Sequence, residues 1–267
     1  MSVIKRFASL FTGNQLSQQL LEYNVRFSQY LMGIGAGTRP HTSGEMSLVR
    51  YLRSHNAAPI CVFDVGANVG QFSGLIRSHC DIRRMQLHCF EPSADAFARL
   101  QEVNGDVAQI TLNQCALGAE PGTATLYSDR PASGLSSLTR RNLEHVGKEM
   151  TLSQEVSVRT VDDYCEENQI DRIHLLKIDV EGHEQDVLTG ARHMFAEDRV
   201  DAVTFEFGGC NIDSRTYFRD FHSFFRDRDM ELFRITPRGY LRQLGPYAET
   251  QEQFLTTNFL AMRRRAA

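Results

Sequence analysis

Four acidic residues each end a short apolar run in this sequence: Asp64, Glu91, Asp179 and Glu206. Such runs are typical of buried strands, and the carboxyl ends of parallel strands meet at one edge of a sheet, where ligands bind. We therefore expect the four carboxylates to converge on one cleft. Carboxylates that lie close together repel one another unless a cation or hydrogen-bond donors offset the repulsion. The four together indicate a binding site more strongly than any one of them does alone.

The segment 60–70 predicts a strand, a tight turn and the start of a helix. Gly66 has no Cβ and can adopt a positive φ, so a ligand can lie against the backbone there. The first amides of the following helix have no intrahelical partners and point toward whatever lies over the turn. This strand–turn–helix unit is typical of the opening of a nucleotide-binding α/β sheet.

The choice of nucleoside depends on the residues around this turn. Glu91 follows Gly70 by about 20 residues, which is where an acid can accept hydrogen bonds from both ribose hydroxyls. A dinucleotide fingerprint requires Gly-x-Gly-x-x-Gly, but Asn68 stands where its second glycine belongs. The pattern Asp64-x-Gly66-x-x-x-Gly70 instead matches sites for S-adenosylmethionine, whose ammonium and sulfonium an acid can attract. We prefer this cofactor to NAD, and an NAD-linked oxidoreductase remains the less favoured alternative.

The order of elements predicts an α/β fold. From residue 60 onward, strand-like and helix-like segments alternate, which predicts a mostly parallel sheet with helices on both faces. Residues 1–56 look helical, with a break at the glycines of 33–37 and a second helix with Ser43 as its N-cap. We therefore divide the chain into an accessory helical segment, 1–56, and a main domain, 57–267. The polar interval 128–154 is the best candidate for a mobile lid or substrate loop.

Bulk composition limits the partners and the compartment. The net charge of −4 and pI near 6.1 give no electrostatic case for nucleic acid. Six cysteines are scattered singly, with no Cys-x-x-Cys pair, as expected in a reducing cytoplasm. Lys5 and Arg6 interrupt the N-terminus too early for a signal peptide, and no apolar run is long enough to span a membrane. The apolar face of the N-terminal helices leaves homo-oligomerisation open.

Four segments, 63–70, 90–92, 113–118 and 176–184, together resemble the FkbM family of methyltransferases. The resemblance extends over about residues 44–262, and Lys-Ile-Asp-Val-Glu-Gly-x-Glu is its most specific motif. It implies the class I methyltransferase fold, a Rossmann-like α/β fold with seven mostly parallel strands, of which the last, near 258–261, is antiparallel. It also implies use of S-adenosylmethionine to methylate hydroxyls of sugars, glycan or glycolipid precursors, or secondary metabolites.

The resemblance assigns roles to the cofactor-binding candidates. It implies that Glu91 holds the ribose. It implies that the methionine part of the cofactor is lined by Asp64, Gly66, Asn68 and Gly70. It also implies that the adenine is bordered by Cys115, Ala116 and Leu117. A domain that binds the cofactor without transferring a methyl group remains an alternative.

A hydroxyl acceptor must lose its proton as the new bond forms, so a base assists the transfer. We expect Asp179 to be this base or to orient the acceptor, with Glu181, His183 and Glu206 as rivals. A divalent metal held by Asp179, Glu206 and a third acid is a further possibility, because a metal would lower the pKa of the acceptor directly. Lys177 lies inside a buried strand and is expected to pair with Glu181, Glu184 or Glu206.

Overall fold

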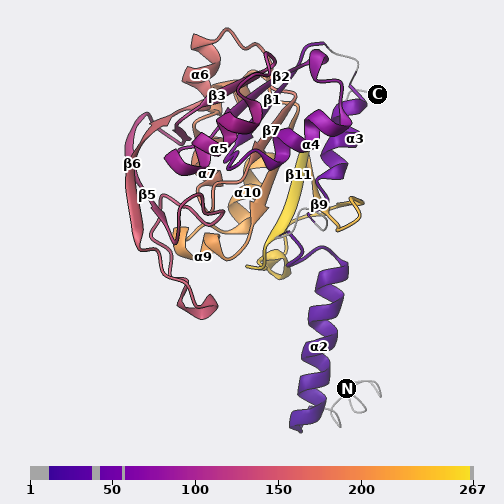
Figure 1. Cartoon of the computed structure of the whole chain (residues 1–267). Coiled ribbons are helices and arrows are strands. Elements are labelled where there is room, and N and C mark those ends of the chain that lie inside the picture. The colour runs from indigo at the N-terminus through magenta and orange to yellow at the C-terminus, as the bar shows by residue number, and fades with distance from the viewer. Residues whose placement is uncertain (1–11, 38–42, 56–57, 265–267) are drawn as a thin grey trace.

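The structure is a computed structural model, and it describes residues 12–37, 43–55 and 58–264 (Figure 1). In chain order, the helices and strands are α2 (Gln15–Leu31), α3 (Met46–Arg53), β1 (Ile60–Val65), α4 (Gln71–His79), η1 (Ile82–Arg84), β2 (Met85–Phe90), α5 (Ala94–Asn104), β3 (Ile110–Asn113), β4 (Ala116–Leu117), β5 (Gly122–Ser128), η2 (Glu144–Val146), β6 (Leu152–Arg159), α6 (Val161–Glu167), β7 (Leu175–Ile178), α7 (Glu184–Thr189), α8 (Arg192–Ala196), β8 (Ala202–Phe207), α9 (Cys210–Ser214), α10 (Phe218–Arg226), β9 (Met230–Ile235), β10 (Leu241–Gln243), η3 (Glu249–Gln251) and β11 (Thr257–Arg263).

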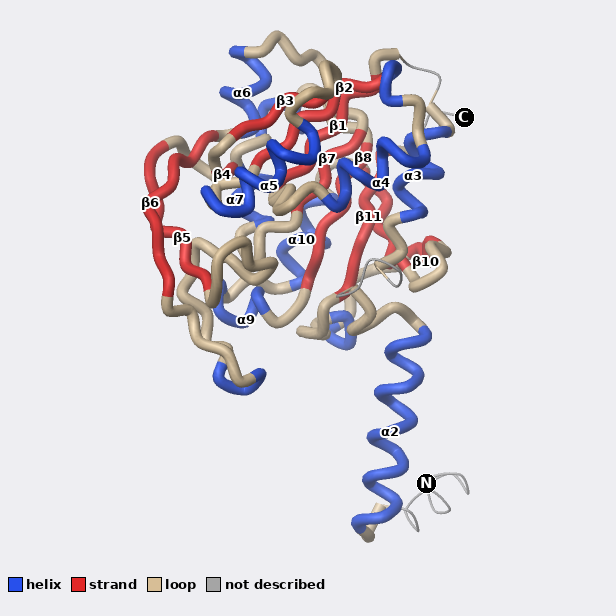
Figure 2. The backbone as a smooth tube through the Cα atoms, viewed as in Figure 1, coloured by secondary structure: helices blue, strands red, loops and turns tan. Residues whose placement is uncertain are grey.

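The main sheet holds eight strands in the order β10-β9-β11-β8-β7-β1-β2-β3 (Figure 2). The five strands from β8 to β3 run parallel, so their carboxyl ends share one edge. β11 lies antiparallel between β8 and β9. The strand order reverses between β1 and β7, and an open sheet of this kind binds ligands outside the carboxyl ends at such a point. The predicted fold class and its antiparallel last strand are therefore confirmed.

Alternating side chains along the strands form two separate cores. On β1, Ile60 and Val62 pack with α3, α4 and α5 on one face of the sheet. Cys61, Phe63 and Val65 point the other way and pack with α6, α7, α8 and α10. This alternation is what a strand covered on both faces requires, because successive side chains leave opposite sides of the pleat. The result is a three-layer sandwich, in which the charged residues Asp64 and Lys177 are buried on otherwise apolar strands.

The details differ from the sequence-based expectation in three places. The sheet has eight strands rather than seven because β10 pairs with β9 and extends that edge. The strand-like pieces near 124–127 and 156–161 form a separate sheet in the order β4-β6-β5. The single helix expected over 184–195 is two helices, α7 and α8: the Gly190 carbonyl accepts from the Asp162 amide, and the amides of His193 and Met194 donate to the Asp162 carboxylate.

The described N-terminal helices behave differently from one another. Leu48, Val49 and Leu52 of α3 are buried against the strands, so α3 is part of the packed body. No residue of α2 is buried, and this helix projects away from the body (Figures 1 and 2). The prediction that Ser43 is the N-cap of the second helix is wrong. α3 begins at Met46 and its N-cap is Glu45, whose side chain makes no capping hydrogen bond. The division at 56/57 stays a prediction, and the apolar positions within 1–11 lie outside the described residues.

None of the described helices is long and apolar enough to cross a membrane.

Candidate active site

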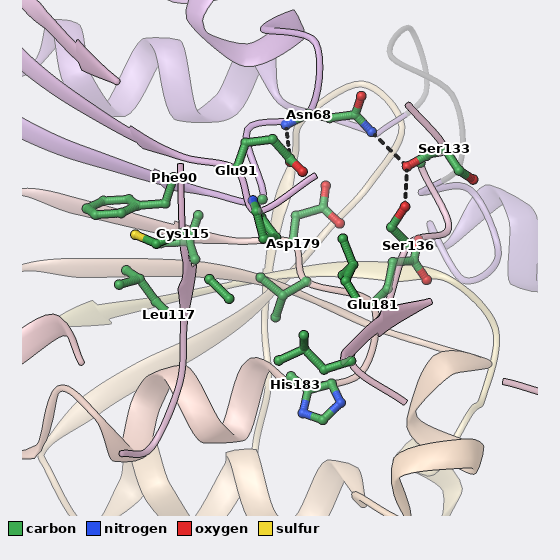
Figure 3. A pocket seen from close by; sticks show the side chains of 18 residues that line it. Asn68, Phe90, Glu91, Cys115, Leu117, Ser133, Ser136, Asp179, Glu181 and His183 are labelled. Atoms are coloured by element: carbon green, nitrogen blue, oxygen red, sulfur yellow. Dashed lines mark hydrogen bonds between the residues drawn. The ribbon is translucent and has the colours of Figure 1, made fainter. Parts of the chain in front are cut away.

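A pocket of about 560 Å³ opens at the carboxyl edge of the sheet, beside the ends of β1, β2 and β7 (Figure 3). One part of its wall is apolar and the other is polar. Its polar part comes from the turns after these strands and from the interval 128–154. We call this space the first pocket; it is lined by Val65, Gly66, Asn68, Phe90, Glu91, Pro92, Cys115, Ala116, Leu117, Leu126, Ser133, Gly134, Ser136, Leu138, Asp179, Val180, Glu181 and His183.

The turn after β1 contains three residues with positive φ, namely Gly66, Asn68 and Gly70. Gly66 has φ of 80°, and a Cβ on it would lie 1.8 Å from the carbonyl oxygen of Asp179. Asn68 has φ of 47°, a region that asparagine tolerates better than most residues. The glycine therefore allows the turn to approach the end of β7, and Asn68 continues the turn into the pocket. Gly70 does not line the pocket; it is the N-cap of α4 and packs against Asn104.

Glu91 faces this turn from the end of β2. Its Oε2 accepts a hydrogen bond from the Asn68 backbone amide at 2.9 Å (Figure 3). Its Oε1 accepts one from the Ser93 amide at 2.8 Å. These bonds fix the carboxylate while it remains at the pocket wall. Burial raises the pKa of Glu91 to about 7, although both amide hydrogen bonds oppose the rise. The carboxyl therefore titrates near neutral pH.

The far end of the first pocket is apolar. Phe90, Cys115 and Leu117 lie together on one side of it (Figure 3). Burial raises the pKa of the Cys115 thiol, so this group behaves as a small hydrophobe. Ala116 and Leu126 complete this end, which suits a flat apolar ring. Glu91 lies between the apolar end of the pocket and the end that holds Asn68 and Asp179.

Asp64 lines neither this pocket nor the one described below. Its side chain is fully buried on the α3 and α4 side of the sheet, and Lys177 Nζ lies 3.1 Å from its Oδ1. The same ammonium lies 3.5 Å from Asp179 Oδ2. Burial alone would lower the pKa of Lys177, but the neighbouring carboxylates raise it above its ordinary value. The expected pairing of Lys177 with Glu181, Glu184 or Glu206 is wrong, because the strand register places Asp64 directly beside Lys177.

The turn after β7 is held by a buried acid. Glu184 Oε1 accepts hydrogen bonds from the amides of Gly182 at 3.0 Å and Val180 at 3.4 Å, and its Oε2 accepts one from Asn211 Nδ2 at 3.3 Å. This turn contains Glu181 in a left-handed conformation with φ of 54°. A non-glycine residue persists there only when its surroundings hold it. Glu184 therefore supports the shape of the pocket wall and does not line the pocket.

Arg141 is a site residue that the sequence did not reveal. It comes from the interval 128–154, is largely buried, and forms ion pairs with Glu181 and Asp213. Burial raises the pKa of Glu181 to about 8, and Arg141 opposes this rise. In addition, Ser137 Oγ donates to the Glu181 carbonyl at 2.7 Å. The interval is therefore fastened to the turn after β7. No local pattern marks Arg141, because its partners lie 40 and 72 residues away.

His183 connects the same interval to α7. Its Nδ1 lies 2.7 Å from Asp186 Oδ2, and its Nε2 lies 2.9 Å from Thr139 Oγ1. A carboxylate only accepts hydrogen bonds, so Nδ1 is the donor and Nε2 of the neutral ring accepts from the Thr139 hydroxyl. Both ring nitrogens are thus already engaged.

Glu206 belongs to a second pocket, of about 400 Å³, on the α3 side of the sheet. Asp179 lines both pockets and so lies at their boundary. The four strand-end acids therefore meet at one edge of the sheet, but the expectation that they converge on one cleft is wrong. Asp64 is buried, Glu91 faces the first pocket, Glu206 faces the second, and Asp179 faces both. The second pocket is lined by Gly37, Ser43, Glu45, Leu48, Lys177, Ile178, Asp179, Thr204, Phe205, Glu206, Ile235 and Asn258.

The divalent-metal alternative finds no support. Within the parts of the chain that the structure describes, no group of three or more His, Cys, Asp or Glu side chains is arranged to hold a metal ion. A cation already lies among the acids, since the Lys177 ammonium is within 3.5 Å of both Asp64 and Asp179.

Comparisons with known proteins give a consistent family. The model of the methyltransferase FkbM domain matches residues 64–232. The chain is 27% identical over 198 residues to the 2-O-methyltransferase NoeI of Sinorhizobium fredii, covering 70% of this chain and 79% of that one. It is 26% identical over 149 residues to the hexuronic acid methyltransferase AglP of Haloferax volcanii, covering 55% and 56%.

A solved structure shares the fold. The crystal structure of methyltransferase FkbM from Methylobacillus flagellatus KT aligns with a TM-score of 0.50 and 18% sequence identity. The alignment covers 87% of this chain and 50% of that chain, so this chain spans half the length of that protein.

Proposed function

The chain belongs to the FkbM family of S-adenosylmethionine-dependent methyltransferases, and on that premise we propose that it methylates a hydroxyl group of a sugar. The observation that carries the proposal is the boundary position of Asp179, which faces a pocket suited to the methyl donor on one side and a polar pocket on the other. One relative is named for 2-O-methylation and another for a hexuronic acid, and both names support transfer to a sugar oxygen.

The first pocket fits S-adenosylmethionine, which supplies an electrophilic methyl group when bound. Phe90, Cys115 and Ala116 would border the adenine, and the Glu91 carboxylate would accept from the ribose hydroxyls. Gly66, Asn68 and Asp179 lie at the other end, where an acid favours a cationic ligand. Asp64 and Gly70 would act through the backbone of this turn rather than by contact.

Asp179 is the best-supported base. It ends β7 at the boundary of the two pockets, and its side chain is 45% exposed, so an acceptor can reach it. Of its rivals, Glu181 is paired with Arg141 and both nitrogens of His183 have partners, whereas Glu206 lines the second pocket and not the pocket suited to the methyl donor. The proton of the acceptor hydroxyl would pass to the Asp179 carboxylate as the oxygen forms its new bond. Correct placement of the reacting groups is expected to supply the larger part of the acceleration.

The test separates binding from transfer. We expect S-adenosylhomocysteine to bind the wild-type protein and Asp179→Asn with similar affinity in calorimetry. Transfer of labelled methyl from S-adenosylmethionine to sugar acceptors should fall by about 10²–10⁴ in Asp179→Asn, the range that one general base contributes. Wild-type turnover in Asp179→Asn would eliminate Asp179 as the base. If S-adenosylhomocysteine did not bind the wild-type protein, the proposed donor site itself would be overturned.

We further propose that α2 joins two copies of the chain. Leu16, Leu20, Tyr23, Phe27 and Tyr30 recur at alternating steps of four and three residues, the spacing of a coiled-coil seam. All five are exposed. The same face of α2 from a second copy of the chain would bury these side chains in a coiled coil. Sedimentation should therefore give a dimer for the wild-type chain and a monomer for Leu20→Ser/Phe27→Ser; a monomeric wild type contradicts the proposal.

We also place the enzyme in the cytoplasm and expect no nucleic-acid partner. All six cysteines are free thiols and five of them are buried, which suits a reducing compartment. The net charge of −4 gives no attraction for a polyanion.

A further inference from the structure

The second pocket is built from two parts of the molecule that are far apart in sequence. Its floor is formed by the ends of β7, β8 and β11, and its roof by Gly37, Ser43, Glu45 and Leu48, of which Leu48 lies on α3. Glu206 and Asn258 are register partners on adjacent strands of this floor. Asn258 Nδ2 donates to the Ser43 carbonyl at 3.0 Å and so ties the floor to the roof.

Most of the polar groups in this pocket are acceptors. Glu45, Asp179 and Glu206 contribute carboxyl groups, and Lys177 is the one cation among the described residues that line the pocket. Its charge is already balanced, because its ammonium lies between Asp64 and Asp179. The space therefore disfavours a further negative charge, because burial and the neighbouring Asp179 raise the pKa values of Glu45 and Glu206 and the Lys177 ammonium is already paired.

Glu206 has no partner for its side chain within the described part of the chain. It is partly shielded from solvent and yet forms no hydrogen bond or ion pair there. Burial raises its pKa well above the ordinary value, and Asp179, Glu181 and Glu184 add to the rise. A carboxyl that is partly shielded from water and has no partner loses part of its hydration, and a ligand that donates hydrogen bonds to it would recover that loss.

We propose that the second pocket binds the methyl acceptor, with Glu206 and Glu45 accepting its hydroxyl hydrogens, and that it selects neutral or amino-bearing sugars over anionic ones. The inference rests on the proposed function and names its substrate class. A neutral sugar supplies several hydroxyl donors, and an amino group would also be attracted by the carboxylates. A uronic acid or a phosphorylated sugar would add negative charge beside acids whose only cation is already paired. This preference separates the chain from its relative named for a hexuronic acid.

The test uses three sugars with one ring and different charge: glucose, glucosamine and glucuronic acid. Binding to the protein saturated with S-adenosylhomocysteine is followed by saturation-transfer NMR. Glucose and glucosamine should bind, and glucuronic acid should bind at least tenfold more weakly. Equal or stronger binding of glucuronic acid, or no binding of any of the three, overturns the proposal.

Variants then locate the binding. Glu206→Leu should lose sugar binding by at least tenfold, and Glu45→Gln should weaken it, while the affinity for S-adenosylhomocysteine stays unchanged. Glu155→Leu, at an exposed position on β6 outside both pockets, is the matched control and should change neither. Sugar binding that survives Glu206→Leu and Glu45→Gln overturns the assignment. Failure of S-adenosylhomocysteine to bind the wild-type chain would instead count against the proposed function, so the two failures are distinguishable.

Discussion

Asp64 on β1 and Lys177 on β7 are register partners in the parallel sheet, and their charged groups lie 3.1 Å apart in a buried setting. Each strand would be an ordinary apolar strand without this pair. The two charges are acceptable only together, because an isolated buried charge is costly. The pair lies directly below the edge at which both pockets open, and it positions the ammonium that also reaches Asp179.

Removing the cation should therefore be costly. We expect Lys177→Met to lower the free energy of unfolding by about 3–5 kcal/mol, because Asp64 would remain buried without its partner. Urea denaturation measures this change. Lys148→Met is the control: Lys148 is 3.6 Å from Asp129 but half exposed, so its loss should cost about 1 kcal/mol or less. Equal losses in the two variants would contradict the role given to the pair.

Cofactor affinity should depend on pH through Glu91. The pKa of this carboxyl is raised to about 7 by burial, and only the ionised form leaves both oxygens free of a proton to accept from ribose hydroxyls. About one-tenth of it is ionised at pH 6 and about nine-tenths at pH 8. Calorimetry should therefore show S-adenosylhomocysteine binding about tenfold more tightly at pH 8 than at pH 6. In Glu91→Gln this slope should disappear; a slope that persists would assign the titration to another group.

The turn after β1 should not tolerate a side chain. In Gly66→Ala the added Cβ would meet the Asp179 carbonyl oxygen at a position with φ of 80°, so β1 and β7 must separate. We expect a loss of more than about 2 kcal/mol in stability and loss of S-adenosylhomocysteine binding. Gly74→Ala is the matched control, since nothing lies within 4 Å of its Cβ and α4 should gain about 0.5–1 kcal/mol.

Arg141 should hold the interval 128–154 over the first pocket. Replacing it by glutamine leaves Glu181 buried beside other acids, so we expect faster amide hydrogen exchange across the interval and a stability loss of about 3 kcal/mol. The neighbouring Arg140→Gln should leave both nearly unchanged, because Arg140 and its partner Glu149 are exposed and 3.9 Å apart. Similar exchange in the two variants would show that Arg141 does not fasten the interval.

The sheet could be predicted because its signals are local. Apolar runs of strand length alternate with segments of helical spacing, and this alternation favours a mostly parallel sheet with helices on both faces. The turn after β1 could also be predicted, because Gly66 suits the positive φ that it adopts there, and asparagine tolerates this region at Asn68. The break between α7 and α8 was missed because Asp162, which accepts from the amides at the start of α8, lies 31 residues before His193, and no pattern near Gly190 reveals that contact.

The site was less predictable than the fold for the same reason. The carboxyl ends of the strands could be placed on one edge, but the face on which each acid lies depends on the register between strands. Register makes Asp64 the partner of Lys177 and sets Glu206 beside Asn258. Arg141 and Thr139 come from a segment without regular structure, so their contacts with Glu181 and His183 follow from tertiary packing alone.

The second pocket takes Ser43, Glu45 and Asn258 from the two flanks of the chain, on either side of the segment 64–232 that the family model matches. The lining of the first pocket lies entirely inside that segment. The machinery that delivers the methyl group can therefore stay constant while the ends of the chain vary. On the acceptor assignment proposed above, a change at Ser43, Glu45 or Asn258 would alter the choice of acceptor and leave the lining of the first pocket untouched.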